Sequence, residues 1–367
     1  MKSLNAAVQY AQDHEINWTR DPLLEPKRYG VHLSDPEPWN VLLGPVYPRG
    51  GVSGVIYKNG ELLQSFGEPH RADQTFSVAK SYLALLVGKA IELKLIANID
   101  QTVNDSLTLQ GVKSAIGFEG PHNTLITWRH LLSQTSEWSG ISFGIPDQAE
   151  HYRHVVLDPK PITGKKGELR PLQTPGTYWE YNDVRINQLS MALLYLYKNS
   201  IPDLFRLYFL DPLGCTDDFV WEGYDNSWIE LPDASLKNTQ RIQSVPGGTH
   251  WGGGVRISAN DQAKIALMML NKGEHVSDQG VRSSLISNQW LELMKTPCSL
   301  APFYGLLTWL NPGQKTFPGA SESAYFMFGA GGNYVWIDPD LNAVIVVRWI
   351  EPAHFPIFTQ KIAQALS

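Results

Sequence analysis

The chain of 367 residues is longer than one compact core usually is, so two lobes or one large mixed domain are both expected. Hydrophobic residues at 43% and charged residues at 18% are typical of a soluble globular protein and exclude a largely disordered one. The formal net charge is -6 and no run of Lys and Arg occurs. Such a chain is not expected to bind nucleic acid or an anionic membrane, so small molecules are favoured as partners.

Localisation and cofactors are predicted from what the sequence lacks. The first residues, MKSLNAAVQYAQDHEINW, contain no apolar signal region and no cleavage site, and no stretch approaches the length of a membrane span. Cys215 and Cys298 lie far apart without metal-ligand spacing, so we interpret them as buried or inert thiols. The sequence contains no metal-ligand cluster and no phosphate-binding loop, so we expect a cytoplasmic protein without a cofactor.

The first hundred residues predict a strand hairpin followed by a buried helix. Residues 3–15 have a mild helical pattern, and the Pro- and Gly-rich residues 22–51 predict irregular chain. In SGVIYKNGELLQSFGEP, Asn59 and Gly60 join two alternating strands, which is the strongest short-range signal for a hairpin. Residues 79–96, AKSYLALLVGKAIELKLI, are apolar over most of their surface and predict a buried helix just after Ser77.

The rest of the chain predicts a helical insertion and a second hairpin. Residues 100–250 mix helical stretches, such as INQLSMALLYLYKNS, with Pro- and Gly-marked loops and little strand pattern. Strand patterns return in NYVWID and AVIVVRW, and IFTQKIAQAL predicts a closing helix. We therefore expect an α+β fold, with an antiparallel sheet flanked by helices in residues 1–100 and 251–367. A mainly helical lobe would comprise residues 101–250, and the active site would lie between the lobes.

Ser77 and Lys80 carry the sharpest chemical signal. A Ser at the first turn of a buried helix and a Lys three residues later lie on one helix face. A serine hydroxyl becomes an effective nucleophile when a neighbouring base takes its proton, and burial lowers the pKa of a lysine towards that role. The alternative is structural, with Ser77 as a helix cap and Lys80 extending to the surface.

Three further segments are candidates for the same site. Tyr181, in PGTYWEYND, is a phenol able to exchange protons with a serine or a leaving group, although an aromatic turn packed in the core is the alternative. The glycine-rich residues 329–333, GAGGN, allow a backbone N–H to approach a carbonyl oxygen, as half of an oxyanion hole requires. His250 lies in a flexible aromatic segment, but no Asp stands out as its partner in a Ser-His-Asp triad, and no G-x-S-x-G motif occurs.

Together these segments resemble the class C beta-lactamase and penicillin-binding-protein-like serine hydrolases, which include esterases, amidases and D-aminopeptidases. The resemblance covers nearly the whole chain and rests on five ordered matches: FSVAKSYLALLVGKAIELKLI, ITWRHLLSQTSEWSG around Gln134, PGTYWEYND, HWGGGVRISANDQA and GAGGNYVWIDPD. It implies an antiparallel sheet flanked by helices plus an all-helical lobe. It also implies Ser77 as nucleophile, Lys80 as first base, Tyr181 as general base or acid, and the N–H groups of Ser77 and Ala330 as oxyanion hole.

The sequence departs from this family at two motifs. Asp183 takes the place of the Asn in the Tyr-x-Asn motif, and its negative charge is expected to hold Lys80 protonated unless its side chain turns away. The Lys-Thr-Gly motif is replaced by Met327, Phe328 and Gly329. The cation and the hydroxyl that hold a substrate carboxylate are thereby lost.

These observations favour an esterase or amide hydrolase that acts on small uncharged substrates through an acyl-enzyme. The residues expected beside the substrate are Gln134, Asp183, His250 and Gly329, with Trp138, Trp251, Met327 and Phe328 lining an apolar acyl pocket. One alternative is a beta-lactamase or D-Ala-recognising peptidase that binds its carboxylate with another cation. The other is a catalytically silent binding or sensor domain, in which the carboxylate beside the lysine has disabled it.

Overall fold

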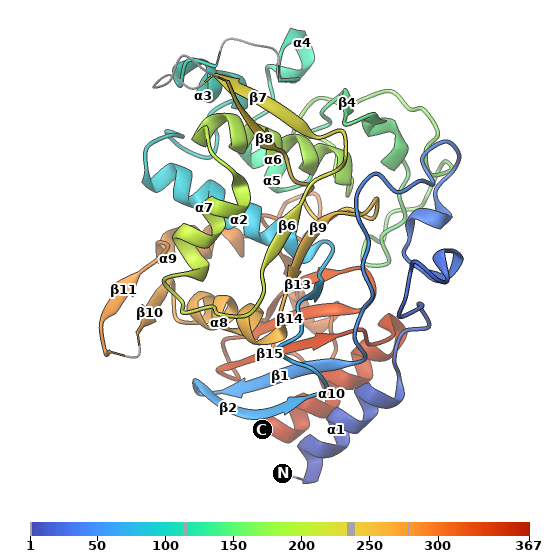
Figure 1. The fold of residues 1–367 in the computed structure, drawn as a ribbon, viewed down its shortest axis with the longest axis vertical. Coiled ribbons are helices and arrows are strands. Elements are labelled where there is room, and N and C mark those ends of the chain that lie inside the picture. The colour runs from blue at the N-terminus through green and yellow to red at the C-terminus, as the bar shows by residue number, and fades with distance from the viewer. Residues whose placement is uncertain (1, 113–115, 233–238, 278) are drawn as a thin grey trace.

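The structure is a computed structural model that describes residues 2–112, 116–232, 239–277 and 279–367. A six-stranded antiparallel sheet forms its centre, in the strand order β12-β13-β14-β15-β1-β2 (Figure 1). The strands are β12 (Trp309–Leu310), β13 (Tyr325–Gly329), β14 (Asn333–Asp338), β15 (Ala343–Arg348), β1 (Ser53–Lys58) and β2 (Glu61–Phe66). Because β1 pairs with β15, both ends of the chain form one sheet, as expected.

Both predicted hairpins are confirmed. Between β1 and β2, Asn59 and Gly60 have φ angles of 54° and 82°, the left-handed conformations that a tight two-residue hairpin turn requires. The second hairpin joins β14 to β15, and every residue of these two strands is buried. Strands buried throughout their length indicate that the sheet is covered on both faces.

Helices from distant parts of the chain cover the sheet. The terminal helices α1 (Lys2–Asp13) and α10 (Phe355–Leu366) pack against each other, and the ring of Phe355 stacks on Tyr334 of β14 with centroids 3.5 Å apart. The helix α8 (Ala259–Leu270) packs on β14, β15 and β1, and Figure 1 shows it on the opposite side of the sheet from α1 and α10.

The buried helix α2 (Val78–Glu92) joins the sheet to the helical region. It contacts β13 and β14 as well as α6 (Asp183–Tyr197) and α7 (Ile201–Phe205). The helix ends earlier than the predicted residue 96, since Lys94 adopts a left-handed φ of 60° that a helix cannot continue. The other helices of this region are α3 (Val103–Leu109), α4 (Gly120–Asn123) and α5 (Trp128–Leu132).

The region 101–250 also contains strands that the sequence pattern did not predict. β7 (Trp228–Pro232) and β8 (Thr239–Gln243) form a hairpin, and β6 (Val220–Glu222) pairs with β9 (Gly254–Ile257), which pairs with β3 (Asp73–Gln74). The β6–β9 pair crosses the predicted boundary at residue 250, so the division into two lobes stays a prediction. The remaining elements are β4 (Ile141–Ser142), β5 (Ile145–Pro146), β10 (Glu274–Val276), β11 (Arg282–Ser284) and α9 (Asn288–Met294).

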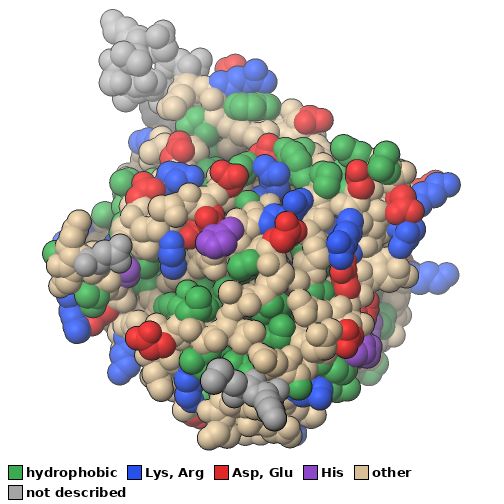
Figure 2. All heavy atoms as spheres, turned by 60° about the horizontal axis from the view of Figure 1, so that its bottom comes forward, with side chains coloured by type: hydrophobic (Ala, Val, Ile, Leu, Met, Phe, Trp, Pro, Cys, Tyr) green, Lys and Arg blue, Asp and Glu red, His purple; other side chains and the backbone are tan. Residues whose placement is uncertain are grey.

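The surface carries charges of both signs. On the face shown in Figure 2, Lys and Arg side chains are interspersed with Asp and Glu, and hydrophobic side chains lie among them. Over the described residues, no helix is both long enough and apolar enough to cross a membrane.

Candidate active site

Ser77 lies at the start of α2 and contacts Lys80 one helical turn later. Lys80 Nζ donates to Ser77 Oγ at 3.0 Å, and the Ser77 hydroxyl donates to the carbonyl oxygen of Gly248 at 3.0 Å. Within α2, which is described throughout, the Ser77 side chain makes no capping hydrogen bond, and Lys80 is only 1% exposed. Both features differ from the structural alternative of a capping serine and a surface lysine. Ser77 itself is half-buried, so its hydroxyl is accessible.

Gly248 is a member of the site that the sequence analysis missed. Its carbonyl oxygen accepts from Ser77 Oγ and also from Lys80 Nζ at 3.4 Å. Gly248 has a φ of +79°, and a Cβ at this position would lie 2.0 Å from the carbonyl oxygen of Phe76. Only glycine permits this approach of one backbone to another. The Gly-Gly pair two residues before His250 was the available signal.

Asp183 and Tyr181 reach the site from the start of α6. Asp183 Oδ1 lies 2.6 Å from Lys80 Nζ, so the carboxylate does not turn away from the lysine. Burial alone would raise the pKa of Asp183, but Arg153 and Lys80 outweigh burial and hold that pKa well below its usual range. The ring of Tyr181 is buried, with its centroid 5.0 Å from Lys80 Nζ.

The last residue of β13 lies against the backbone of Ser77. A Cβ on Gly329 would be 1.9 Å from the carbonyl oxygen of Thr75 and 3.0 Å from the backbone nitrogen of Ser77. The absence of a side chain here therefore allows β13 to approach the start of α2. Ala330 follows directly, which places it near Ser77, and Asn333 Nδ2 holds its carbonyl oxygen at 2.7 Å.

An aromatic group lies beside these residues. The ring of Phe328, half-buried, is 4.8 Å from that of Trp309, which is 5.4 Å from Tyr181. Tyr304 packs edge-on against Trp309 at 4.8 Å and lies 6.1 Å from Tyr181. Phe328 and Tyr181 were predicted from the sequence. Trp309 and Tyr304 were not, because they come from a segment without a recognisable motif.

Four predicted substrate-binding residues are fully buried and have partners inside the protein. Trp138 Nε1 donates to Gly117 O at 2.6 Å and Trp251 Nε1 to Trp39 O at 2.8 Å. Gln134 Oε1 accepts from the backbone of Asn182 at 3.1 Å, which positions the segment that carries Tyr181. Met327 is a core residue of β13. The part of Gln134, Trp138, Trp251 and Met327 in substrate binding stays a prediction that these contacts do not support.

His250 has aspartate partners, contrary to expectation. Its Nδ1 lies 3.1 Å from Asp183 Oδ2 and its Nε2 lies 2.6 Å from Asp35 Oδ2. Burial would lower the pKa of His250, but the hydrogen bonds to the two carboxylates outweigh burial and raise it. Both ring nitrogens are engaged, so the ring has no nitrogen left to offer a substrate.

His250 is one of three residues whose ligand atoms lie close enough together to hold a metal ion, but the ammonium of Lys166 contacts the other two. Asp35, Glu150 and His250 each present one ligand atom, and these atoms lie within 4.8 Å of one another. Lys166 Nζ contacts the carboxylate of Asp35 and lies 3.0 Å from Glu150 Oε1. Lys166 and Arg153 both contact Glu150, and Lys166 and His250 both contact Asp35, so each carboxylate has partners without a metal ion.

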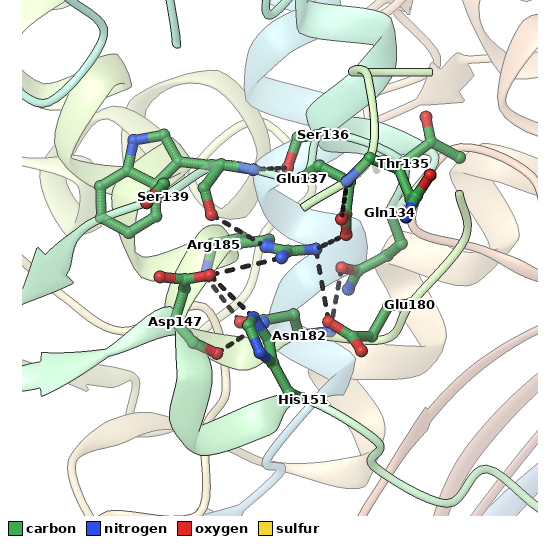
Figure 3. Close-up of polar contacts among 12 residues, drawn as sticks. Gln134, Thr135, Ser136, Glu137, Ser139, Asp147, His151, Glu180, Asn182 and Arg185 are labelled. Atoms are coloured by element: carbon green, nitrogen blue, oxygen red, sulfur yellow. Dashed lines mark hydrogen bonds and ion pairs between the residues drawn. The ribbon is translucent and has the colours of Figure 1, made fainter. Parts of the chain in front are cut away.

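A second buried ionic cluster holds Arg185 near the start of α6 (Figure 3). Arg185 Nη1 lies 2.8 Å from Glu137 Oε1, and Arg170 makes two contacts of 2.7 Å to the same carboxylate. Arg185 Nε also donates to Trp138 O at 3.1 Å. Burial would raise the pKa of Glu137, yet its hydrogen bond to Arg170 and the charge of Arg185 lower it to about 2. Arg185 follows Asp183 by two residues, so this cluster helps to fix Asp183 in place.

Replacing Glu137 with Gln is expected to destabilise the protein by about 3 kcal/mol at neutral pH, because two buried guanidinium groups lose a charged partner. The pKa of Glu137 in the folded protein, about 2, lies below the ordinary 4.5. The stabilisation from the ionised carboxylate is therefore present above about pH 4.5 and is lost as the pH falls through about 2. Urea unfolding at several pH values measures it. The exposed Glu61→Gln serves as control, and a difference between wild type and Glu137→Gln that does not shrink at acid pH would contradict the assignment.

Comparisons with known proteins identify a matching family model and similar folds. The family model described as Beta-lactamase matches residues 46–349. No curated protein matches the chain. The solved structure of EstCE1, a hydrolase with promiscuous acyltransferase activity, is 15% identical, with a TM-score of 0.58 over 100% of this chain and 98% of that one.

Two further solved structures are similar in fold. A putative beta-lactamase from Bacteroides dorei is 16% identical, with a TM-score of 0.58 over 85% of this chain and 92% of that one. A D-stereospecific amidohydrolase from Streptomyces sp. is 14% identical, with a TM-score of 0.55 over 97% of this chain and 98% of that one. The predicted α+β fold of beta-lactamase/transpeptidase type is confirmed.

Proposed function

The chain belongs to the beta-lactamase family, and we propose that it is a serine hydrolase that forms an acyl-enzyme on Ser77 from small uncharged esters or amides. The observation that carries the proposal is the 3.0 Å contact between Lys80 Nζ and Ser77 Oγ, made by a lysine that is 1% exposed. A buried amine beside an accessible hydroxyl is the arrangement that activates a serine nucleophile.

In the proposed reaction, neutral Lys80 takes the Ser77 proton while Ser77 Oγ attacks the substrate carbonyl carbon. The N–H groups of Ser77 and Ala330 donate to the oxyanion that forms. The carbonyl re-forms as the bond to the leaving alkoxide or amine breaks, and Tyr181 passes a proton to that group. Lys80 then passes the serine proton to Tyr181, which restores both groups. Water attacks the acyl carbon and gives one proton to Lys80, the bond from that carbon to Ser77 Oγ breaks, and Lys80 returns the proton to Ser77 Oγ as the carboxylic acid leaves.

The preference for uncharged substrates follows from the side chains around Ser77. Met327 and Phe328 stand where a lactam-binding member has a cation and a hydroxyl, and Phe328 continues into Trp309 and Tyr181. Besides Lys80, the cation Arg153 lies beside this group, with its guanidinium carbon 5.0 Å from the centroid of the Tyr181 ring. Arg153 already pairs with Asp183 and Glu150, which disfavours it as a carboxylate-binding residue for a lactam or a D-Ala peptide.

Three probes distinguish the candidate functions: a fluorophosphonate, a short-chain p-nitrophenyl ester and a cephalosporin. We expect one fluorophosphonate adduct in the intact mass and turnover of the ester, with no turnover of the cephalosporin. Cephalosporin turnover would favour the lactamase alternative. A protein that reacts with none of the three would be the catalytically silent alternative.

Replacing Tyr181 with Phe is expected to slow ester turnover by on the order of a hundredfold, because the proton donor to the leaving group is removed. Tyr178→Phe is the matched control, since Tyr178 packs on Arg170 with its ring centroid 4.3 Å from the guanidinium carbon. Steady-state kinetics with the p-nitrophenyl ester measure both variants. A near-normal rate for Tyr181→Phe would remove the role proposed for the phenol.

A further inference from the structure

We propose that His250 and Arg153 are positioning residues that neutralise Asp183, so that Lys80 can release its proton and act as the base. This inference rests on the proposed function, since it concerns the base that activates Ser77. A carboxylate beside Lys80 without other cationic partners would stabilise the ammonium form of the lysine and block proton transfer from Ser77. Cationic partners of Asp183 weaken this effect.

Asp183 is contacted by three cationic groups at once. Lys80 Nζ lies 2.6 Å from Oδ1, while Arg153 Nη1 lies 2.8 Å and His250 Nδ1 lies 3.1 Å from Oδ2. The Lys80 ammonium forms an ion pair with Oδ1, and His250 Nδ1 contacts the other oxygen, Oδ2. The hydrogen bonds of Lys80 go to Ser77 and Gly248. The lysine is therefore oriented towards the nucleophile, and the carboxylate is hydrogen-bonded on its other side.

The hydrogen-bond partners of His250 require its ring to be charged. Each ring nitrogen faces an oxygen of a carboxylate, Asp183 on one side and Asp35 on the other, and an ionised carboxylate only accepts hydrogen bonds. Both nitrogens must then donate, which only the imidazolium can do. Burial would raise the pKa of Asp35, but the hydrogen bond and charge of His250, together with the ammonium of Lys166, outweigh burial and lower it.

The other groups facing the imidazolium do not cancel its charge. Glu150 Oε1 lies 3.8 Å from Nε2 and is shared with Lys166 and Arg153. Burial and the charge of His250 lower the pKa of the neighbouring His32, which stays neutral. Burial raises the pKa of Tyr224, which also stays neutral.

The charges in this cluster balance without a proton on Lys80 when the other three cationic groups are charged. Its carboxylates are Asp35, Glu150 and Asp183, and its cationic side chains are Arg153, Lys166, His250 and Lys80. With Lys80 protonated as well, the cluster carries one excess positive charge among buried side chains. Lys80 is the member that contacts Ser77, so its proton is the one released in the reaction.

The charge state of His250 is measurable without catalysis. In nitrogen-15 NMR spectra of the full chain, with the resonance assigned through the His250→Gln variant, both ring nitrogens are expected to carry protons at neutral pH. They are expected to remain protonated above the pH at which an ordinary histidine titrates. A neutral ring at neutral pH would overturn the inference, even if the enzyme hydrolysed none of the proposed substrates.

The effect on Lys80 is tested by the pH profile of kcat/KM. His250→Gln is expected to shift the acid limb to higher pH and to slow the reaction about tenfold near neutral pH, because Asp183 then has one cationic partner fewer and holds the lysine protonated more strongly. Adding Asp183→Asn to this variant is expected to move the acid limb back to lower pH. The carboxylate whose charge His250 neutralises is then absent. A uniform loss at every pH that Asp183→Asn does not reverse would show a merely structural role.

Arg153 provides a second test that does not depend on the folding of the histidine variant. Arg153→Gln is expected to shift the acid limb in the same direction as His250→Gln, and Arg153→Lys, which keeps the charge, is expected to restore most of the wild-type profile. Unshifted limbs in Arg153→Gln and His250→Gln, in a wild type that does turn over esters, would refute this inference and leave the proposed function intact. A wild type that neither turns over the ester nor is labelled by the fluorophosphonate would instead refute the proposed function.

Discussion

Replacing Ser77 with Ala is expected to abolish fluorophosphonate labelling and to lower ester turnover by at least about a thousandfold, because no other group takes over the nucleophile's bond to the acyl carbon. The loss of helix stability is expected to be below about 1 kcal/mol, because the Ser77 side chain makes no capping bond within α2. Active-site labelling, steady-state kinetics and thermal unfolding measure these three quantities on the same preparation.

Ser81→Ala is the matched control for this variant. Ser81 lies on the same helix one turn later, is buried, and donates to Leu307 O at 2.6 Å, so its loss tests the removal of a buried hydroxyl outside the site. It is expected to cost about 1 kcal/mol of stability and to keep turnover within about twofold. The opposite pattern, with Ser77→Ala destabilised and still active, would identify Ser77 as a helix cap and reject the proposed nucleophile.

Replacing Lys80 with Met is expected to slow ester turnover by on the order of a hundredfold or more, because the group that takes the serine proton is lost while its volume is kept. The protein is expected to fold, since Asp183 retains Arg153 and His250 as partners when the ammonium is removed. Turnover is measured with the p-nitrophenyl ester, and folding by circular dichroism.

Lys89→Met is the control for Lys80→Met. Lys89 lies near the other end of α2 and bonds to Glu92 and to Leu285 O, both at 2.9 Å, so it has no part in the site. Its turnover is expected to match the wild type within about twofold. A near-normal rate in Lys80→Met would mean that another group activates the serine.

Local patterns were sufficient to predict most of the sheet and the pair at the start of α2. A hairpin depends on the residues of its own turn, as Asn59 and Gly60 illustrate, and an i, i+3 pair on one helix lies side by side whatever surrounds it. Ser77 and Lys80 are such a pair. Asp183 and Ala330 were assigned through family resemblance, because their proximity to Ser77 depends on how α6 and β13 pack.

The buried charges around Asp183 could not be predicted from the sequence. Asp35, Arg153 and Lys166 come from loops and Glu150 from a 3-10 helix of four residues, where neither helical nor strand periodicity distinguishes a buried charge from a solvated one. Their burial is stabilised by partners distant in the sequence, such as the pair of His250 with Asp35. The same holds for Glu137, whose partners Arg170 and Arg185 lie in other segments. An ion pair between two loops cannot be predicted from local sequence patterns, because the paths of the loops are not known from the sequence.

The acyl group itself identifies the nucleophile most directly. Wild-type protein is quenched with acid during turnover of a p-nitrophenyl ester, digested, and the peptides are sequenced by mass spectrometry. We expect the added mass of one acyl group on the hydroxyl of Ser77 and its absence in Ser77→Ala. An acyl group on a different side chain, or steady turnover with Ser77 unmodified under conditions that trap the intermediate, would contradict the account.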